Sequence, residues 1–375
     1  MTNARRLLDL GQSVWLDFIR RGRLLDGEFD RQIEQGVVGV TSNPTIFQLA
    51  IAAGTDYDAA IQAGIARDLE GPALFEAIAV EDIQMACDRL RPVFERTGGR
   101  DGRVSIEVSP RLAHDTAATL EEARRLHRSV ARENVMVKVP ATAAGLPAIK
   151  ILTAEGLCIN VTLIFSLARY EQVIDAYLRG LEQRLAQGLA LDRIFSVASF
   201  FVSRVDTKVD AAIEAASAAL PEGARERAEL SNWRGRAAIA NARLAYRKFR
   251  EHFAEPRFAP LRAAGAQVQR PLWASTSTKN PAYRDVLYVE ELIGADTVNT
   301  MPPQTLAAFN DHGTVEPRIE RDLVHAHALF TRLPALGVPV DRLIEALEQE
   351  GVTAFAKSYE ALLAALETKR REMVA

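Results

Sequence analysis

The sequence predicts an α/β fold, specifically a closed (β/α)8 TIM barrel, from two observations. Short β-branched runs alternate with longer stretches of helical periodicity, a pattern typical of a parallel sheet. Eight such runs fit within one chain of 375 residues, which favours a closed barrel over an open doubly wound sheet. The predicted strands are residues 13–18, 37–41, 103–108, 135–139, 158–163, 194–199, 271–275 and 297–301.

Extra helices are expected around this barrel. The first ten residues predict a short N-terminal helix, and residues 206–265, rich in Ala, Arg and Glu, predict a helical insertion after the sixth strand. Residues 316–375 predict helices that pack on the outside of the barrel. Because no tandem repeat or Gly/Ser-rich linker separates these pieces, we expect residues 1–375 to form a single domain.

Composition argues against several other classes of protein. The chain is 48% hydrophobic and 25% charged, and its formal net charge of −3 gives no overall attraction to nucleic acid or anionic membranes. No run approaches the roughly 20 apolar residues of a membrane span, and the N-terminus lacks a signal-peptide core. Cys87 and Cys158 lie in apolar runs, as reduced buried thiols do. We therefore expect a cytoplasmic protein without nucleic-acid or membrane partners.

Polar side chains gather where the predicted strands end, which is the face of a TIM barrel that carries catalytic residues. A barrel with only structural duties would fill these interior positions with Val, Ile and Leu. Here nearly every strand ends with a hydroxyl, an amide or a charge, namely Asp17, Thr41, Ser42, Asn43, Glu107, Lys138, Asn160, Thr162, Ser196, Ser199, Ser275, Lys279, Asn299 and Thr300.

Lys138 is the most informative of these residues. It lies in the apolar run VMVKVPAT, although only seven of the 46 Lys and Arg residues are lysines. Burial favours the neutral amine, which can attack a ketone and form an iminium that serves as an electron sink. The alternative is a structural ion pair with Glu107 or Asp17.

Asp17 and Glu107 end the first and third predicted strands, so both can face the same cavity as Lys138. Carboxyl groups there could move the protons of Schiff-base chemistry, or could only balance the charge of the lysine; the two roles are compatible. After the seventh strand, Ser277 and Lys279 could bind phosphate, and Arg204 could add a second cation. The alternative for each of these cations is a solvated loop charge.

No metal site or organic cofactor is expected. His325 and His327 form an H-x-H pair in a helical pattern, where residues two apart do not face one another. Strand ends supply no further set of His and Asp ligands. Neither a G-x-G-x-x-G motif after a strand nor a P-loop is present.

Several linked motifs resemble those of the transaldolases. They are VGVTSNPTIF, VSIEVSPRLAHDT, VMVKVPAT, CINVTLIFS, SFFVSR and WASTSTKNP, in family order and approximate spacing over residues 10–315. The run NTMPPQTLAAFNDHG is most similar to the longer bacterial members rather than to the short fructose-6-phosphate aldolase group. The resemblance implies a cofactor-independent enzyme of the non-oxidative pentose phosphate pathway. It would transfer a dihydroxyacetone unit from sedoheptulose 7-phosphate to glyceraldehyde 3-phosphate, giving erythrose 4-phosphate and fructose 6-phosphate, through a lysine Schiff base.

The resemblance also implies residue roles. Lys138 would form the Schiff base, Asp17 would be the general acid/base at the C4 hydroxyl, and Glu107 with Thr162 would position and activate water. The implied substrate-binding residues are Asn43 and Asn160 for the dihydroxyacetone portion, Ser199 and Phe201 for the wall around the hydroxyls, and Arg204, Ser277 and Lys279 for the phosphate.

Some positions depart from the family pattern. Lys279 stands where the family often has arginine, while Phe200 and Ser203 stand where proline and glycine are common, and these positions bear on phosphate affinity and donor preference. One alternative function is a fructose-6-phosphate-type aldolase that releases dihydroxyacetone. Another is a catalytically silent barrel acting as an interaction module, against which the retained lysine and carboxylates argue. The resemblance is compatible with a homodimer.

Overall fold

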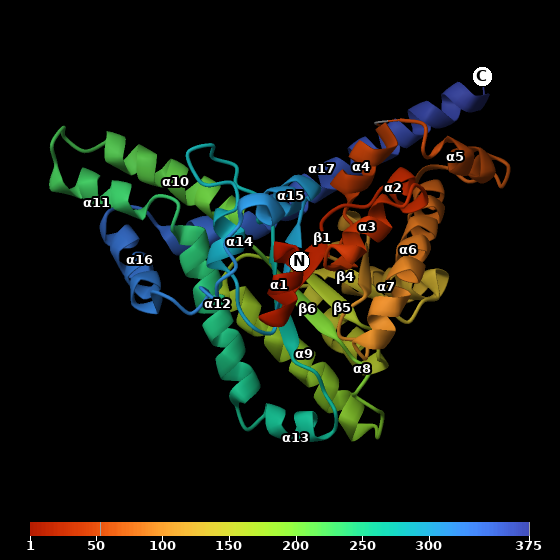
Figure 1. The fold of residues 1–375 in the computed structure, drawn as a ribbon, viewed down its shortest axis with the longest axis horizontal. Coiled ribbons are helices and arrows are strands. Elements are labelled where there is room, and N and C mark those ends of the chain that lie inside the picture. Colours follow the sequence, from red (N-terminus) through yellow and green to blue (C-terminus); the bar gives the residue numbers. More distant parts are fainter. Residues whose placement is uncertain (53, 375) are drawn as a thin grey trace.

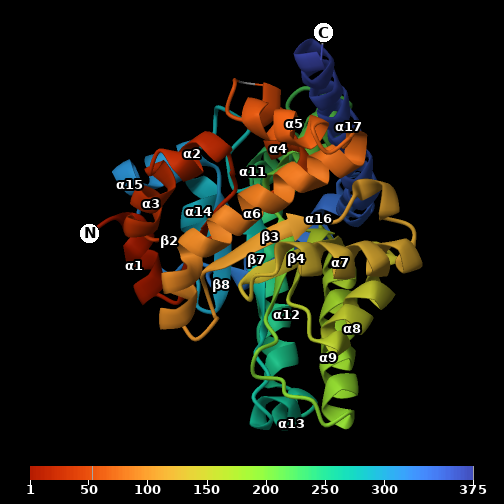
Figure 2. The same cartoon turned by 90° about the vertical axis from the view of Figure 1, so that its right-hand side faces the viewer.

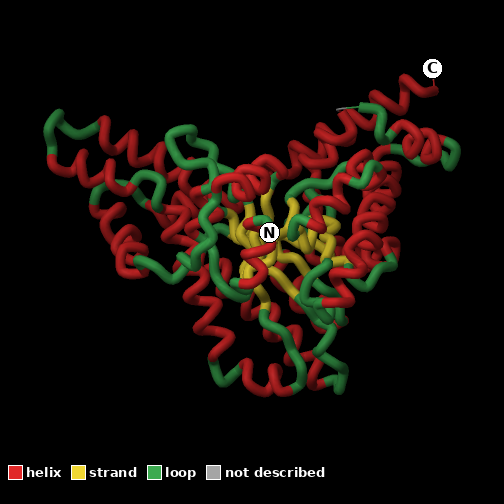
Figure 3. The backbone as a smooth tube through the Cα atoms, viewed as in Figure 1, coloured by secondary structure: helices red, strands yellow, loops and turns green. Residues whose placement is uncertain are grey.

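The computed structural model describes residues 1–52 and 54–374. Eight parallel strands pair in chain order and close into a barrel at the centre of the molecule (Figure 3). The predicted (β/α)8 barrel is therefore confirmed. The strands are β1 (Gln12–Leu16), β2 (Val37–Val40), β3 (Arg103–Glu107), β4 (Val135–Pro140), β5 (Ile159–Ile164), β6 (Ser196–Phe201), β7 (Gln269–Ala274) and β8 (Thr297–Met301).

Helices surround the barrel on all sides (Figure 1). They are α1 (Asn3–Asp9), α2 (Arg21–Leu25), α3 (Glu28–Glu34), α4 (Pro44–Ala52), α5 (Asp58–Ile65), α6 (Gly71–Arg96), the 3-10 helix η1 (Pro110–Leu112), α7 (Thr116–Val130), α8 (Gly145–Glu155), α9 (Leu167–Ala186), α10 (Ser203–Ala218), α11 (Arg225–Trp233), α12 (Ala237–Ala254), α13 (Phe258–Ala263), α14 (Leu287–Glu291), α15 (Pro303–His312), α16 (Leu323–Ala335) and α17 (Val340–Val374). None of these helices is both long and apolar enough to cross a membrane.

Strand limits agree with the sequence prediction to within two residues. The strand at 297–301 matches β8, whereas the predicted strand 194–199 lies two residues before β6. The difference arises because Ile194 is buried beside the strand without belonging to it. Every residue of β6 is buried, as in strands covered on both faces, so no alternation of polar and apolar residues marks the ends.

The region after β6 is helical, as predicted for residues 206–265. It contains α11, α12, α13 and most of α10. Helix α12 contacts both α9 and β7, so it covers the barrel wall, while α10 and α11 extend to one side (Figure 1). That this region is an insertion within a single domain stays a prediction.

Helix α17 packs against other helices outside the strands, as predicted for residues 316–375, but it covers one end of the barrel. It crosses the C-terminal mouth of the barrel, against α4, α5, α6 and α10, and its end projects past the body of the protein (Figure 2). Thr45 on α4 donates to Ser358 at 2.9 Å, and Arg111 of η1 pairs with Glu360 at 2.8 Å. The sequence did not predict this position, because an apolar helical stripe shows that a face is buried without showing what covers it.

The opposite, N-terminal end of the barrel is closed by buried charges. Arg270, at the start of β7, donates to Ser13 Oγ at 2.7 Å, to Asp101 Oδ1 at 3.0 Å and to the Arg100 carbonyl at 2.9 Å. Ser13 in turn donates to Asp101 Oδ2 at 2.9 Å. These contacts close the end of the barrel with a hydrogen-bonded ion-pair network.

Candidate active site

Lys138 and Glu107 lie side by side inside the mouth of the barrel. Their strands β4 and β3 are paired in a register that sets Glu107 opposite Lys138. Side chains alternate along a strand, so Val137 and Val139 point to the opposite face from Lys138. The Lys138 Nζ donates to Glu107 Oε2 at 3.1 Å and to the Ser42 carbonyl at 3.3 Å. The two side chains are only 5% and 8% exposed, so their charges interact in a poorly hydrated space.

Asp17 follows β1 directly and is held at the same mouth. Its backbone N–H donates to the Met301 carbonyl at 2.8 Å, and its Oδ1 accepts a hydrogen bond from Thr41 Oγ1 at 2.8 Å. Burial raises the pKa of Asp17 above its ordinary value, while the positive charges of Lys138 and Lys279 oppose this rise.

Burial also raises the pKa of Glu107. The positive charge of Lys138 opposes the rise, and the negative charge of Asp17 adds to it. Both carboxyl groups therefore hold their protons to a higher pH than exposed carboxyls do. A carboxyl group with a raised pKa can donate and accept protons closer to neutral pH, as general acid/base catalysis requires.

The Asn160 amide is oriented by two neighbours inside the barrel. Asn160 pairs with Lys138 across β4 and β5, and its side chain is fully buried. Its Nδ2 donates to Ser105 Oγ at 3.0 Å, and its Oδ1 accepts from Ser199 Oγ at 2.7 Å. These two contacts fix the orientation of the amide within the barrel.

Thr162 lies two residues further along β5. Its Oγ1 is buried and has no hydrogen-bond partner in the described part of the chain. Directly after it, Leu163 has φ of 60°, and the strand register shifts between Val161 and Ile164. Such a bulge redirects side chains near functional sites, and an unpaired buried hydroxyl is costly unless something else pairs with it.

Asn43 lies close to Lys138 and Glu107, and its side chain also caps a helix. Its Oδ1 accepts from the Ile46 backbone N–H at 3.0 Å, at the start of α4. Together with Glu107 and Tyr359 it lines a cavity of about 70 Å³. The residue before it, Ser42, accepts a hydrogen bond from Lys138 Nζ through its backbone carbonyl, so Asn43 lies close to Lys138.

Arg204 lies between two aromatic rings at the mouth. Its guanidinium carbon is 5.7 Å from the centre of the Phe201 ring and 6.0 Å from that of Phe355. Burial lowers the pKa of Arg204. Among residues 1–52 and 54–374, no carboxylate forms an ion pair with it. A partly desolvated arginine with its N–H groups unused is suited to bind an anion.

The loop after β7 brings two further predicted residues near Arg204. Lys279 Nζ donates to Ser277 Oγ at 2.8 Å. The backbone N–H of Ser203 donates to the Ser275 carbonyl at 3.1 Å, joining the start of α10, which carries Arg204, to this loop. The residues predicted to bind phosphate, Arg204, Ser277 and Lys279, thus come from two segments that this backbone hydrogen bond joins.

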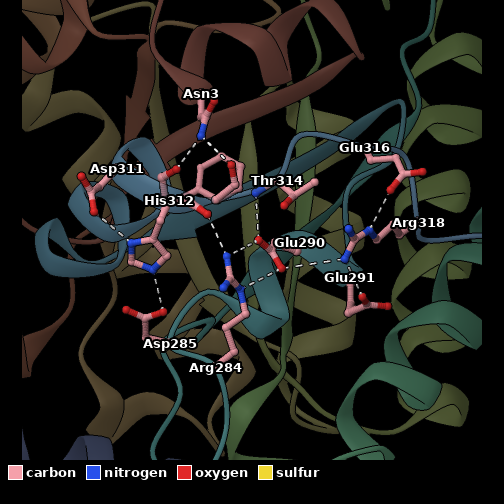
Figure 4. Close-up of polar contacts among 12 residues, drawn as sticks. Asn3, Arg284, Asp285, Glu290, Glu291, Asp311, His312, Thr314, Glu316 and Arg318 are labelled. Carbon is pink, nitrogen blue, oxygen red and sulfur yellow. Dashed lines mark hydrogen bonds and ion pairs between the residues drawn. The ribbon is translucent and has the colours of Figure 1, made fainter.

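A polar network anchors the far end of that loop (Figure 4). The Arg284 guanidinium donates to Glu290 at 3.0 Å and to the His312 carbonyl at 2.8 Å. The His312 ring contacts Asp285 at 2.9 Å, and the Thr278 hydroxyl donates to the Asp285 carbonyl at 3.0 Å. The loop is therefore tied to α14 and α15 on either side.

Comparisons with known proteins show the family of this chain. The family model for transaldolase/fructose-6-phosphate aldolase matches residues 14–366. This chain belongs to that family. Among its relatives are transaldolase 1 of Streptomyces coelicolor, 50% identical over 96% of this chain and 93% of the relative, and transaldolase 2 of a Nostoc species, 46% identical over 96% of each. The transaldolase of Acidothermus cellulolyticus is 49% identical over 96% of each chain.

Family membership confirms the resemblance seen in the sequence. The match includes every residue singled out there, from Asp17 to Lys279. The relatives named as transaldolases cover nearly the full length of this chain, which supports the likeness to the longer members. The roles assigned to individual residues are not tested by these comparisons and stay predictions.

Phe355 lies at the site although its sequence context does not mark it as a site residue. The ring centre of Phe355, on α17, is 5.7 Å from Lys138 Nζ. In the sequence, Phe355 belongs to an apolar helical stripe with Tyr359 and Leu362, which is what any buried helix shows. Ser105 is likewise unmarked, because a serine inside a strand carries no signal of the amide that it orients.

The H-x-H pair does not approach this site. His327 contacts Arg247 at 3.3 Å, and His325 lines a separate hollow beside α12 and α16. In the part of the chain that the structure describes, no three His, Cys, Asp or Glu side chains come together as metal ligands could.

Proposed function

We propose that this transaldolase family enzyme transfers a three-carbon ketol unit between sugar phosphates through a Schiff base on Lys138. The observation that carries the proposal is the buried contact between Lys138 Nζ and Glu107 at 3.1 Å, inside the barrel mouth. An amine with an adjacent carboxyl group is the arrangement that imine formation needs. We propose sedoheptulose 7-phosphate or fructose 6-phosphate as donor and glyceraldehyde 3-phosphate as acceptor.

The first step joins the donor to the enzyme. The Lys138 amine attacks the C2 ketone and gives a carbinolamine. Protonation of the carbinolamine hydroxyl by Glu107 lets water leave and produces the iminium. The raised pKa of Glu107 supports this role, because a carboxyl group must hold its proton to donate it. The unpaired hydroxyl of Thr162 supports a position for the departing water.

The second step breaks the C3–C4 bond. Asp17 takes the proton of the C4 hydroxyl, the electron pair of the bond moves into the iminium, and the aldose phosphate leaves. A neutral enamine remains on Lys138, and the protonated Asp17 is ready to return its proton when an acceptor aldehyde is attacked. The raised pKa of Asp17 supports both halves of this cycle.

Binding of the substrate would use the remaining predicted residues. Asn43 and Asn160 would hold the hydroxyl groups of the dihydroxyacetone portion, with Ser199 and Phe201 forming the wall beside them. Arg204, Ser277 and Lys279 would bind the phosphate, because the described chain leaves the guanidinium of Arg204 without a carboxylate partner. A cytoplasmic location and a homodimer are part of the same proposal; buried thiols at Cys87 and Cys158 support the former.

Reductive trapping tests the proposal directly. The enzyme is incubated with fructose 6-phosphate and borohydride, digested, and analysed by mass spectrometry for a reduced three-carbon adduct. We expect the adduct on Lys138, its loss in Lys138→Ala, and its retention in Lys357→Ala, which removes an exposed lysine of α17. Folded enzyme that carries no adduct, or carries it on another lysine, would overturn the Schiff-base assignment.

An isotope assay separates transfer from simple aldol cleavage. With labelled fructose 6-phosphate and erythrose 4-phosphate, a transferase passes the label to the acceptor, whereas an aldolase releases labelled dihydroxyacetone. We expect most of the label in the seven-carbon product. Label found mainly in dihydroxyacetone at saturating acceptor would support the aldolase alternative instead.

A further inference from the structure

Phe355 lies between the two cations of the proposed site. Its ring centre is 5.7 Å from Lys138 Nζ and 6.0 Å from the Arg204 guanidinium carbon. The side chain is 5% exposed. One aromatic ring from the last helix therefore contacts both the residue that would carry the intermediate and the residue that would bind the phosphate.

The contacts of α17 hold this ring in place from several directions. Lys208 on α10 pairs with Glu350, Arg169 on α9 pairs with Glu348 at 2.8 Å, and Thr45 donates to Ser358 at 2.9 Å. These contacts lie on both sides of Phe355 along the helix. A ring anchored in this way loses little further freedom when substrate binds.

Two aromatic rings contact the guanidinium of Arg204. Phe201 from β6 and Phe355 from α17 each lie within cation–π range. A carboxylate at this position would compete with a phosphate for the same N–H groups, whereas an aromatic face stabilises the cation and leaves its donors available. Holding Arg204 with rings thus keeps it ready for an anion.

The ring also matters for the enamine on Lys138. Loss of the enamine to water needs a proton delivered to its nucleophilic carbon, C3, followed by attack of water on C2 that breaks the C2–N bond. The net change consumes one water molecule and releases dihydroxyacetone and the lysine amine. An apolar ring beside Nζ removes space in which that water could stand.

We propose that Phe355 is a positioning and specificity-determining residue, which shields the intermediate on Lys138 from water and holds Arg204 for the phosphate. The share of turnovers that end in transfer rather than in released dihydroxyacetone would then depend on this ring. The inference rests on the proposed Schiff-base function and adds to it a residue outside the barrel strands.

Three substitutions separate the two effects. Phe355→Ala removes both volume and ring, Phe355→Leu keeps apolar volume without a π face, and Phe355→Tyr keeps the ring. We expect the ratio of dihydroxyacetone release to transfer to rise about tenfold in Phe355→Ala and less in Phe355→Leu. The KM for glyceraldehyde 3-phosphate should rise about tenfold in both, the size of one lost cation–π contact at a desolvated site, and recover in Phe355→Tyr.

The matched readout is the non-phosphorylated acceptor glyceraldehyde, whose KM should not change in any variant, because it makes no use of Arg204. Ser358→Ala is the control for the helix, since it removes the Thr45 contact and leaves both rings untouched. We expect its release ratio to equal that of the wild type. Circular dichroism and the borohydride adduct on Lys138 report folding and chemistry for each variant.

Two results would overturn the inference. If Phe355→Ala and Phe355→Leu fold, form the Lys138 adduct and show an unchanged release ratio, the ring does not shield the intermediate. If KM rises equally for both acceptors, Phe355 only packs the helix and does not position Arg204. Failure of the proposed function itself would look different, because wild-type enzyme would then carry no adduct on Lys138.

Discussion

The two ends of the barrel both bury charged side chains, but they treat them differently. At the N-terminal end, Arg270 has Ser13, Asp101 and a backbone carbonyl as partners, and Asp101 is bonded through both oxygens. At the C-terminal mouth, Arg204 has aromatic rings and no ion-pair partner in the described chain. The Thr162 hydroxyl there is unpaired. A buried arginine is thus paired with a carboxylate at the N-terminal end, whereas the arginine at the mouth has no carboxylate partner in the described chain.

This difference shows how to tell structural charges from functional ones. A buried polar group with all of its partners inside the protein specifies the fold, because removing one partner leaves the others exposed to the cost of burial. A buried polar group with a missing partner costs stability in the empty enzyme. Arg204 is a partly buried cation without a carboxylate partner in the described chain, so the mouth is where the phosphate group is expected to bind.

The largest expected effect is at the mouth, on activity. Lys138→Met should lower the transfer rate by a factor on the order of 10⁴ or more, since no other nucleophile replaces the amine. Folding should survive, because Glu107 with its raised pKa can remain protonated once the lysine is gone. The coupled transfer assay and urea unfolding measure the two quantities. A variant that keeps activity within tenfold would contradict the comparison.

The matching substitution at the other end should affect stability. Arg270→Met leaves Asp101 buried without its cation, so we expect a loss of roughly 3–5 kcal/mol in the free energy of unfolding. The turnover of the molecules that remain folded should be unchanged. Arg100→Met is the control, since its ion pair with Asp296 is exposed and should be worth no more than about 1 kcal/mol. If urea unfolding shows equal losses in the two variants, the buried network stabilises the fold no more than an exposed ion pair does.

Two threonines sharpen the contrast at smaller scale. Thr162→Val removes a hydroxyl without a partner, so unfolding free energy should change by less than about 1 kcal/mol while the transfer rate falls roughly 10–100-fold. Thr297→Val, at the N-terminal end, removes a hydroxyl that accepts from Gln12 at 2.9 Å. It should cost roughly 1–3 kcal/mol and leave the rate unchanged. Urea unfolding and transfer rates measure both quantities. If Thr162→Val mainly lowers stability and Thr297→Val mainly lowers the rate, the proposed difference between the two ends is wrong.

The smallest effect is expected at the surface network behind the phosphate loop. Hydrogen bonds with Asp285 and Asp311 raise the pKa of His312 above its ordinary value. The protonated ring ties the loop most firmly, so this tether is fully present below about pH 6.5 and is lost as pH rises through the raised pKa. We expect the KM for phosphorylated acceptors to rise by up to about twofold across that window, and less at high salt.

His312→Gln provides the control for the pH effect, because its side chain does not titrate. The acceptor's own phosphate titrates at about pH 6 in both enzymes, so the comparison is between wild type and variant with the same phosphorylated acceptor. The variant should lack the additional rise in KM. A wild-type profile that is equally steep for phosphorylated and non-phosphorylated acceptors would place the titrating group elsewhere, for example on Asp17 or Glu107.

The sequence by itself determined the barrel and the contents of its mouth. Eight β-branched runs and the polar residues at their ends predicted the fold, and Lys138, Asp17 and Glu107 could be expected to meet because parallel strands bring their C-terminal ends together. That expectation needs only the order of the strands along the chain and the alternation of side chains along each strand, and both can be read from the sequence.

Only the tertiary structure decided what lies over the mouth and which polar groups stay unpaired. Phe355 reaches Lys138 because α17 docks on α4, a contact between segments about 300 residues apart in the chain that no local pattern encodes. The unpaired Thr162 hydroxyl and the bulge at Leu163 likewise depend on which neighbours the closed barrel provides. Sequence patterns show that a side chain is buried or polar, whereas long-range packing determines its partners.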